Sequence, residues 1–350
     1  MNMKPGFHEA DLWKPATNAE VDCFLCEHRC HLSSGNRGAC GVRENAGGHL
    51  VTLVWGKVIA SHVDPIEKKP LFHYLPGSQS YSIAAVGCNF QCGFCQNWRI
   101  SQWSRTASGE FPGDTMAPED VVRAAVRSGC KSISYTYTEP TVFFEYTRDI
   151  GVLARKAGLG NIYVTNGFMT PEALDRMVGW LDAANVDLKA WQDGFYRRVC
   201  KARLEPVKAS IAAMHAAGIW VEVTTLLVPG QNDSPDDLKG IAGFLASVSP
   251  DIPWHVTRYH PDFNVTQPPP TPVDTIEKAV DIGRGAGLRY VYAGNIAGMQ
   301  DTVCPSCGQT VISRRGMGVA GTDLNGASCG KCGAGLPIIV EFEPRTEPRT

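Results

Sequence analysis

Short runs of hydrophobic and β-branched residues alternate with helix-like segments along the middle of the chain. The runs that predict strands lie at 81–86, 131–137, 161–165, 184–188, 219–228 and 254–259, with a further run at 288–293. The segments between them begin at helix-starting residues such as Pro118, and several end on an Ala-Gly pair. This alternation predicts a parallel sheet with helices outside it, because parallel neighbours need crossover connections. Six repeats favour a full or partial βα barrel, with a doubly wound sheet as the competing α/β architecture.

Polar residues follow most of these predicted strands. The strand-end segments are Tyr137-Thr138-Glu139, Thr165-Asn166-Gly167, Asp187-Leu188-Lys189, Val228-Pro229-Gly230 and Arg258-Tyr259-His260. Each one alone is also ordinary turn chemistry or a solvated ion pair. Ligands of α/β sheets bind at the carboxyl ends of the strands, so five such segments together predict a ligand site at one rim.

Thirteen cysteines divide the chain further. The first predicted strand runs into the loop GCNFQCGFCQNW, residues 87–98, whose metal-ligand candidates are Cys88, Cys92 and Cys95. Three thiolates are one ligand short of a closed zinc or iron–sulfur site. The loop therefore predicts a metal centre with an open position, or a zinc site completed from elsewhere. The isolated Cys130 and Cys200 are expected to be core or loop thiols, with hydrogen donation by Cys200 as the less favoured alternative.

Four further cysteines lie near each end of the chain. The C-terminal set, in two C-x2-C-Gly pairs, is Cys304, Cys307, Cys329 and Cys332. Its pattern predicts a closed structural zinc site of the zinc-ribbon type, with rubredoxin-like iron as the alternative. The N-terminal set is Cys23, Cys26, Cys30 and Cys40. It can hold zinc or an auxiliary iron–sulfur cluster, and zinc is favoured because short Cys elements are commonly structural.

These features predict four regions. They are an N-terminal Cys-rich element (1–50), a lead-in segment (51–80), the partial barrel (81–300) and a C-terminal zinc-ribbon-like module (301–350). We call the first region the head and the last the tail.

Composition and charge narrow the class of protein. With 350 residues, 43% of them hydrophobic, the chain can bury a large core, and a formal net charge of -2 argues against nucleic-acid binding. No apolar stretch reaches the 18 residues of a membrane span, and the first 20 residues lack the apolar run of a signal peptide. We therefore expect a cytoplasmic protein without membrane partners.

The motifs quoted above resemble a known superfamily. GCNFQCGFCQNW is similar to the cluster motif of the radical S-adenosylmethionine (SAM) superfamily, and the strand-end motifs resemble those of pyruvate formate-lyase activating enzymes. The segment DPIEKKPLFHYLPGS at 64–78, CQNW and the cysteine head resemble the radical SAM enzyme of the AmmeMemoRadiSam system. The resemblance implies a partial (β/α)6 barrel.

The resemblance also implies cofactors. Cys88, Cys92 and Cys95 would hold three irons of a [4Fe-4S] cluster, and SAM would bind the fourth iron. The residues that match SAM-contacting positions are Phe94, Thr138, Glu139, Thr165, Asn166, Asp187, Lys189 and His260. Three positions depart from the activating enzymes: Tyr137-Thr138 replaces a Gly-Gly pair, Val164 replaces an Asp and Thr224 replaces an Arg.

The activity implied by the resemblance is reductive cleavage of SAM to a 5′-deoxyadenosyl radical that abstracts hydrogen from a small molecule or peptide. The alternative is activation of a glycyl-radical enzyme, and an alternative of another class is a non-catalytic zinc-binding adaptor. A one-electron donor such as flavodoxin or ferredoxin is the expected partner. No catalytic residue beyond the cluster ligands is assigned.

Overall fold

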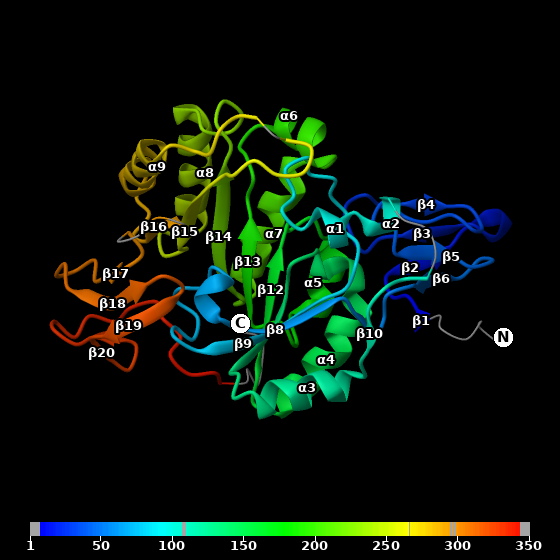
Figure 1. Ribbon diagram of the computed structural model, residues 1–350, viewed down its shortest axis with the longest axis horizontal. Coiled ribbons are helices and arrows are strands. Elements are labelled where there is room, and N and C mark those ends of the chain that lie inside the picture. Colours follow the sequence, from blue (N-terminus) through cyan, green and yellow to red (C-terminus); the bar gives the residue numbers. More distant parts are fainter. Residues whose placement is uncertain (1–7, 107–109, 266, 295, 297–298, 344–350) are drawn as a thin grey trace.

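The centre of the molecule is one eight-stranded sheet (Figure 1). The computed structural model describes residues 8–106, 110–265, 267–294, 296 and 299–343. Seven strands of the sheet are parallel: β9 (Gln79–Ala84), β11 (Ser132–Tyr135), β12 (Gly160–Thr165), β13 (Ala183–Asp187), β14 (Trp220–Leu227), β15 (Trp254–Arg258) and β16 (Val291–Gly294). The predicted runs, including the further one near 288–293, therefore each contain a strand.

The strand order decides between the two α/β architectures. The strands follow one another in sequence order from β9 to β16, without the reversal that defines a doubly wound sheet. The sheet is thus an open barrel, and the doubly wound alternative is wrong. An eighth strand, β8 (Ala60–Pro65), pairs antiparallel with β9 at one edge. Sequence analysis did not predict this strand, which belongs to the lead-in segment.

Helices connect the parallel strands and cover the outside of the sheet. The longer ones are α3 (Pro118–Arg127), α4 (Phe144–Lys156), α5 (Pro171–Met177), α7 (Leu204–Ala216), α8 (Pro235–Val248) and α9 (Val273–Gly285). Local sequence explains several starts. Ser234 caps α8 by accepting from Asp237 N at 3.1 Å, and Thr170 caps α5 by accepting from Ala173 N at 3.1 Å. In both helices a proline follows the cap, where its missing N–H is not needed.

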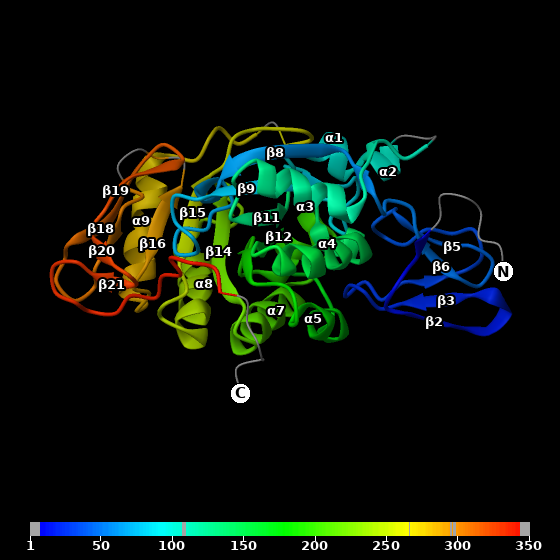
Figure 2. The same cartoon turned by 90° about the horizontal axis from the view of Figure 1, so that it is seen from below.

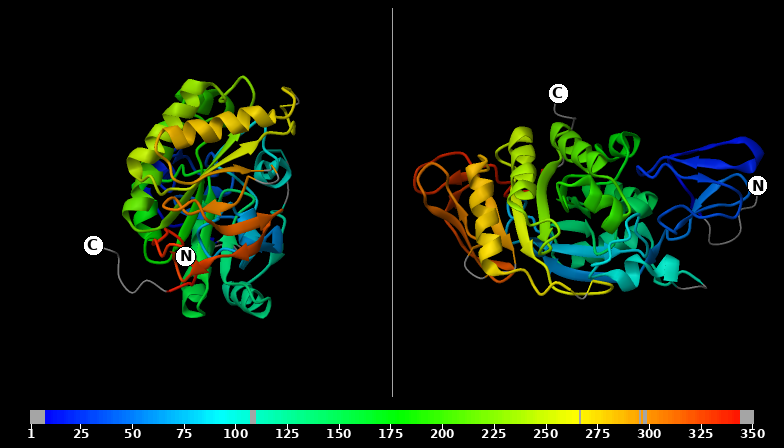
Figure 3. Two further views of the ribbon diagram at one scale, coloured as in Figure 1. Left: turned by 90° about the vertical axis from the view of Figure 1, so that its left-hand side faces the viewer. Right: turned by 90° about the horizontal axis from the view of Figure 1, so that it is seen from above.

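The head and the tail lie at opposite ends of the long axis (Figure 2). The head contains two small sheets, one of β1 (His8–Glu9), β6 (Leu50–Thr52) and β5 (Arg43–Asn45), the other of β2 (Trp13–Pro15), β3 (Val21–Cys23) and β4 (His31–Leu32). The tail contains β17 (Thr302–Val303), β18 (Thr310–Arg315) and β19 (Gly318–Thr322) in one sheet and the pair β20 (Leu324–Asn325) and β21 (Ser328–Cys329). Figure 3 shows the tail beside α9 at the β16 end of the barrel.

A buried polar network joins the tail and the lead-in segment to the amino ends of the barrel strands. Glu222, at the start of β14, accepts from His255 Nε2 at 2.7 Å and from the backbone N of His73 at 2.8 Å. His73 Nε2 lies 2.6 Å from the Tyr292 hydroxyl, and its Nδ1 lies 2.9 Å from the Pro337 carbonyl of the tail. Arg314 of β18 donates to the Phe72 carbonyl at 2.7 Å. This network fixes the tail at the end of the barrel opposite the strand-end motifs.

No helix among the described residues is long and apolar enough to span a bilayer.

Candidate active site at the carboxyl ends of the strands

The loop with three cysteines follows β9 at the carboxyl end of the sheet. Cys92 is buried, while Cys88 and Cys95 are half-buried. The Phe90 N–H donates to Cys88 Sγ at 3.3 Å, and Ser101 Oγ lies 3.2 Å from Cys95 Sγ. Burial raises the pKa of the Cys88 and Cys95 thiols, each of which also feels the neighbouring Cys92. Thiols held together with N–H and O–H donors aimed at the sulfur fit the ligand set of an iron–sulfur cluster.

Cys92 differs from the other two because it has a fourth cysteine beside it. Cys200 ends a short π-helical turn, Tyr196–Cys200, and its carbonyl accepts from Gln91 N at 3.0 Å. A hydrogen bond from the Cys200 thiol, together with the Lys189 ammonium, lowers the pKa of Cys92. Cys200 is fully buried. The expectation of a core or loop thiol holds for its burial, but the sequence spacing gave no sign that it touches one of the three loop cysteines.

Glu139 organises the neighbouring strand ends. Its carboxylate Oε1 accepts from Thr141 Oγ1 and from Thr165 Oγ1, each at 2.6 Å, and its Oε2 accepts from Asn166 N at 2.8 Å. Asn166 Nδ2 in turn donates to Asn89 Oδ1, inside the cysteine loop, at 2.7 Å and lies 3.9 Å from Cys88 Sγ. The ends of β11 and β12 are therefore fastened to the cysteine loop through one buried carboxylate.

Tyr137 adopts a backbone conformation that is usual for glycine. Its φ is +65°, in the left-handed region that side chains disfavour by about 1–2 kcal/mol. Asp64 accepts a short hydrogen bond from the Tyr137 hydroxyl, and Lys69 Nζ lies 4.6 Å from the centre of its ring. Lys69 also donates to Asp64 at 2.7 Å. The DPIEKKP segment thus holds Tyr137 in place, and the following Thr138 donates to the Ala85 carbonyl at 2.6 Å.

The end of β13 contributes a lysine ammonium, and β14 contributes a threonine hydroxyl. Lys189 Nζ donates to Asp187 Oδ2 at 2.8 Å. Burial disfavours the Lys189 charge, but the Asp187 carboxylate and the Cys92 sulfur hold its pKa well above the usual range. Thr224, the partner of Asp187 in the β13–β14 register, has a buried Oγ1 with no hydrogen-bond partner among the described residues. A charged amine and an unpaired buried hydroxyl beside the cysteine loop fit a polar ligand such as SAM.

The segment after β15 lies against the cysteine loop. Asn264 N donates to the Gly93 carbonyl at 3.0 Å, and the Phe263 ring stacks on Trp98 with centroids 4.9 Å apart. This segment runs along the carboxyl end of the strands (yellow in Figure 1). Phe94 is buried, with its ring centroid 6.1 Å from that of Phe195. His260 is exposed, and within the described residues no hydrogen bond joins it to the other expected SAM contacts.

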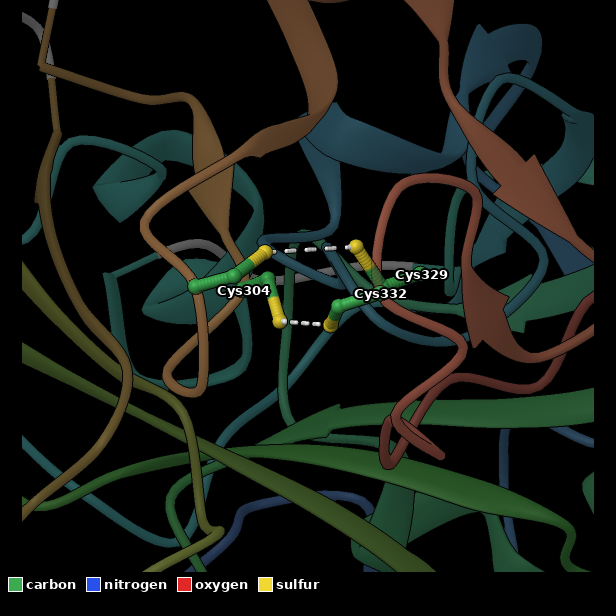
Figure 4. Close-up of side chains that lie close together, drawn as sticks. Cys304, Cys329 and Cys332 are labelled. Carbon is green, nitrogen blue, oxygen red and sulfur yellow. Dashed lines mark hydrogen bonds between the residues drawn. The ribbon is translucent and has the colours of Figure 1, made fainter.

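The four tail cysteines come together as the sequence predicts. Their sulfurs all lie within 4.8 Å of one another, with Cys304–Cys332 at 3.8 Å and Cys307–Cys329 at 3.7 Å (Figure 4). A tetrahedral zinc ion with Zn–S bonds of about 2.3 Å separates its sulfurs by roughly 3.8 Å. The set can therefore hold a metal ion of that size.

The head meets the rim through its cysteine hairpin. Cys26 pairs with Met169 in an isolated bridge, and Glu27 N donates to the Phe168 carbonyl at 3.3 Å. His28 Nε2 lies 2.8 Å from the Asn89 carbonyl. Cys23, Cys26 and Cys40 are buried, and Cys30 is half-buried.

Sequence reasoning missed several residues that build the site. They are Asp64, Lys69, Asn89, His28 and Arg105, which donates to the Cys88 carbonyl at 2.7 Å. The DPIEKKP motif was the available signal for the first two. The others make their contacts across long sequence separations, which local patterns do not encode.

Comparison with known proteins identifies the family. Residues 82–245 match the family model of the radical SAM superfamily. The uncharacterized protein MJ0808 of Methanocaldococcus jannaschii is 42% identical over 95% of this chain and 99% of its own length. The benzylsuccinate synthase activating enzyme of Thauera aromatica is 25% identical over 40% of this chain and 44% of its own.

Among solved structures, a radical SAM methyltransferase from Sphaerobacter thermophilus matches with 18% identity and a TM-score of 0.49, covering 67% of this chain and 70% of its own. The family match spans β9 to α8, which carry the cysteine loop and most of the strand-end motifs. The chain belongs to the radical SAM superfamily.

Proposed function

We propose that this chain cleaves SAM reductively and uses the resulting 5′-deoxyadenosyl radical to abstract hydrogen from a small molecule or peptide. The observation that supports the proposal is Lys189 at the carboxyl ends of the strands, whose ammonium donates to Asp187 Oδ2 at 2.8 Å and whose pKa is raised by the Asp187 carboxylate and the Cys92 sulfur. A bound [4Fe-4S] cluster supplies the electron that breaks the carbon–sulfur bond of SAM.

Several residues of the chain would bind and position SAM. Lys189 is a compact positive charge that can bind the carboxylate of SAM, with the Thr224 hydroxyl as a neighbouring donor. Glu139 is already held by donors of this chain, so we propose that it positions Asn166 and the cysteine loop as well as any SAM amino group. Phe94 presents an apolar surface suited to adenine. His260 is exposed, and its expected role is contact with the ribose.

The cover over the rim supports a small molecule or peptide as the substrate. The segment 259–265 packs on Gly93 and Trp98, and the head contacts Phe168 and Met169. Closure of the mouth by these segments would keep water and oxygen from a radical. Activation of a glycyl-radical enzyme is the second candidate, favoured by the match to the benzylsuccinate synthase activating enzyme. It requires a mouth wide enough for a protein loop.

The test is anaerobic reconstitution with iron and sulfide, reduction with dithionite and detection of 5′-deoxyadenosine by mass spectrometry. We expect brown protein with charge-transfer absorption and one methionine per deoxyadenosine. A reconstituted protein with its cluster that makes no deoxyadenosine contradicts the proposal. Colourless protein that takes up only zinc supports the adaptor alternative instead.

A further inference from the structure

One arginine donates hydrogen bonds to both the head and the cysteine loop. Arg105, in α2 (Trp103–Thr106), donates through Nη2 to the Cys88 carbonyl at 2.7 Å and also to the Ala39 carbonyl of the head. Its Nη1 lies 3.4 Å from the Phe90 carbonyl. One guanidinium therefore joins the residue before Cys40 to the residues on both sides of Asn89. The planar fork of arginine fixes the spacing of these carbonyls.

The backbones of the two cysteine regions also touch. Gly87, which precedes Cys88, has φ +106°, and a Cβ built there would lie 3.3 Å from the Cys40 carbonyl and 2.5 Å from Val42 Cγ1. Only glycine permits this approach. Ser104 Oγ donates to the same Cys40 carbonyl at 3.1 Å. The Cys40 carbonyl therefore lies directly against the residue that precedes Cys88.

The head cysteines sit in surroundings that favour thiolates bound to a metal centre. Arg43, itself almost fully buried, donates through Nη1 to Cys23 Sγ at 3.3 Å, and Ala39 N donates to Cys30 Sγ at 3.4 Å. A Cβ at Gly38 would lie 3.6 Å from Cys30 Sγ and 3.9 Å from Cys40 Sγ. The missing side chain leaves space beside the sulfurs. N–H donors to sulfur are a usual means of stabilising an iron–sulfur cluster. The Arg43 guanidinium is also paired with the buried Glu145 carboxylate.

The spacing of the sulfurs separates the head from the tail. Among the described residues, the tail cysteines are the set of three or more ligating groups whose atoms all lie within 4.8 Å. Within the part of the chain that the structure describes, neither the head cysteines nor the three loop cysteines form such a group. A cluster places irons and sulfides between its thiolates and so holds them farther apart than a single zinc ion does.

We propose that Cys23, Cys26, Cys30 and Cys40 bind an iron–sulfur cluster that relays electrons from an external donor to the cluster loop at Cys88. A reduced low-potential protein, of the flavodoxin or ferredoxin type, loses one electron. The head cluster gains that electron and then passes it on, returning to its oxidised form, and no atom or proton is transferred. The relay rests on the proposed function, but the presence of the head cluster does not.

The first experiment removes the loop cluster and leaves the head. The full-length variant Cys88→Ala/Cys92→Ala/Cys95→Ala is reconstituted anaerobically, and iron, zinc and the electron paramagnetic resonance spectrum after dithionite reduction are measured. We expect the variant to keep about four irons and the wild type about eight, as for one and two [4Fe-4S] clusters. Cys130→Ala, at a buried cysteine away from both regions, is the matched control and should keep the wild-type iron content. A triple variant without iron and with two zinc ions overturns the proposal.

The second experiment tests the relay. The variant Cys23→Ser/Cys26→Ser should form deoxyadenosine with dithionite at a rate close to wild type, but at least tenfold more slowly with reduced flavodoxin. Equal rates with both reductants contradict the relay. If this variant does not fold, the iron content of the triple variant still decides whether the head holds a cluster. A wild type that keeps eight irons yet makes no deoxyadenosine contradicts the proposed function alone.

Discussion

The head and the tail each carry four cysteines, but they meet opposite ends of the same barrel. The head contacts the carboxyl rim through His28 and Cys26, beside the cysteine loop. The tail contacts the lead-in segment through Arg314 and the Pro337 carbonyl, and it contacts the start of β16 through Thr302 Oγ1, which lies 2.8 Å from the Tyr292 hydroxyl. Because chemistry in such barrels takes place at the carboxyl ends, the position of a metal module predicts its role better than its cysteine count does.

Substitutions in the cysteine loop and in the tail should differ most in their effect on deoxyadenosine formation. Cys92→Ala should remove a ligand of the proposed loop cluster and lower deoxyadenosine formation by about a thousandfold or more. Zinc content should not change, because the tail is untouched. Mass spectrometry and metal analysis of the same sample measure both. A loss of zinc in Cys92→Ala would mean that the loop holds zinc.

Removal of the tail metal should act on stability. Cys304→Ala leaves three thiolates around the metal position, and the tail module should lose on the order of 5 kcal/mol of folding free energy because metal binding supplies it. Limited proteolysis should then cut within 301–343, while iron content stays at the wild-type level. Ser306→Ala, beside the same site but not a ligand, is the control and should stay resistant. Intact resistance of Cys304→Ala contradicts a structural metal in the tail.

Acidification should affect the stability of the two ends of the molecule in opposite directions. Burial lowers the pKa of His73, under the tail, from 6.5 to about 4. The unfolded chain therefore binds a proton that the folded chain does not, and stability falls between pH 6.5 and 4 by up to about 3 kcal/mol. In the head, Asp22 and Glu20 raise the pKa of the exposed His31, so its contribution is present below the unfolded pKa and is lost as pH rises.

Hydrogen exchange, corrected for the intrinsic rate at each pH, can measure both ends at once. Protection of β16 and β18 should fall on acidification from pH 6.5 to 4.5, while that of β3 and β4 should not. His73→Gln should flatten the acid response of the tail end. A response unchanged in His73→Gln would assign it to other groups.

The smallest effect is expected at the lead-in segment. Tyr137→Phe removes the hydrogen bond to Asp64 and leaves the ring beside Lys69, so the left-handed backbone loses part of its support. We expect about 1–2 kcal/mol lower unfolding free energy and a few-fold higher KM for SAM. Tyr137→Gly removes both the side-chain contact and the backbone strain. We expect its KM for SAM to lie closer to the wild-type value than the KM of Tyr137→Phe. Denaturant titration and initial rates test the pair.

Sequence patterns predict the strands and the three loop cysteines because both are encoded locally. A β-branched run is readable within five residues, as at 161–165, and the cysteine spacing within eight. The strand β8 was missed because its pairing with β9 depends on the lead-in segment folding back. Glu139 was identified, but its four donors come from Thr141, Thr165 and Asn166, and the sequence does not show that they turn its carboxylate toward the protein.

Arg105 and His28 hold the cysteine loop by its backbone carbonyls and not by its sulfurs. The geometry of the cysteine loop therefore depends on residues outside the loop, one of them in the head. A change in the head that shifts His28 would move the loop backbone without removing a sulfur.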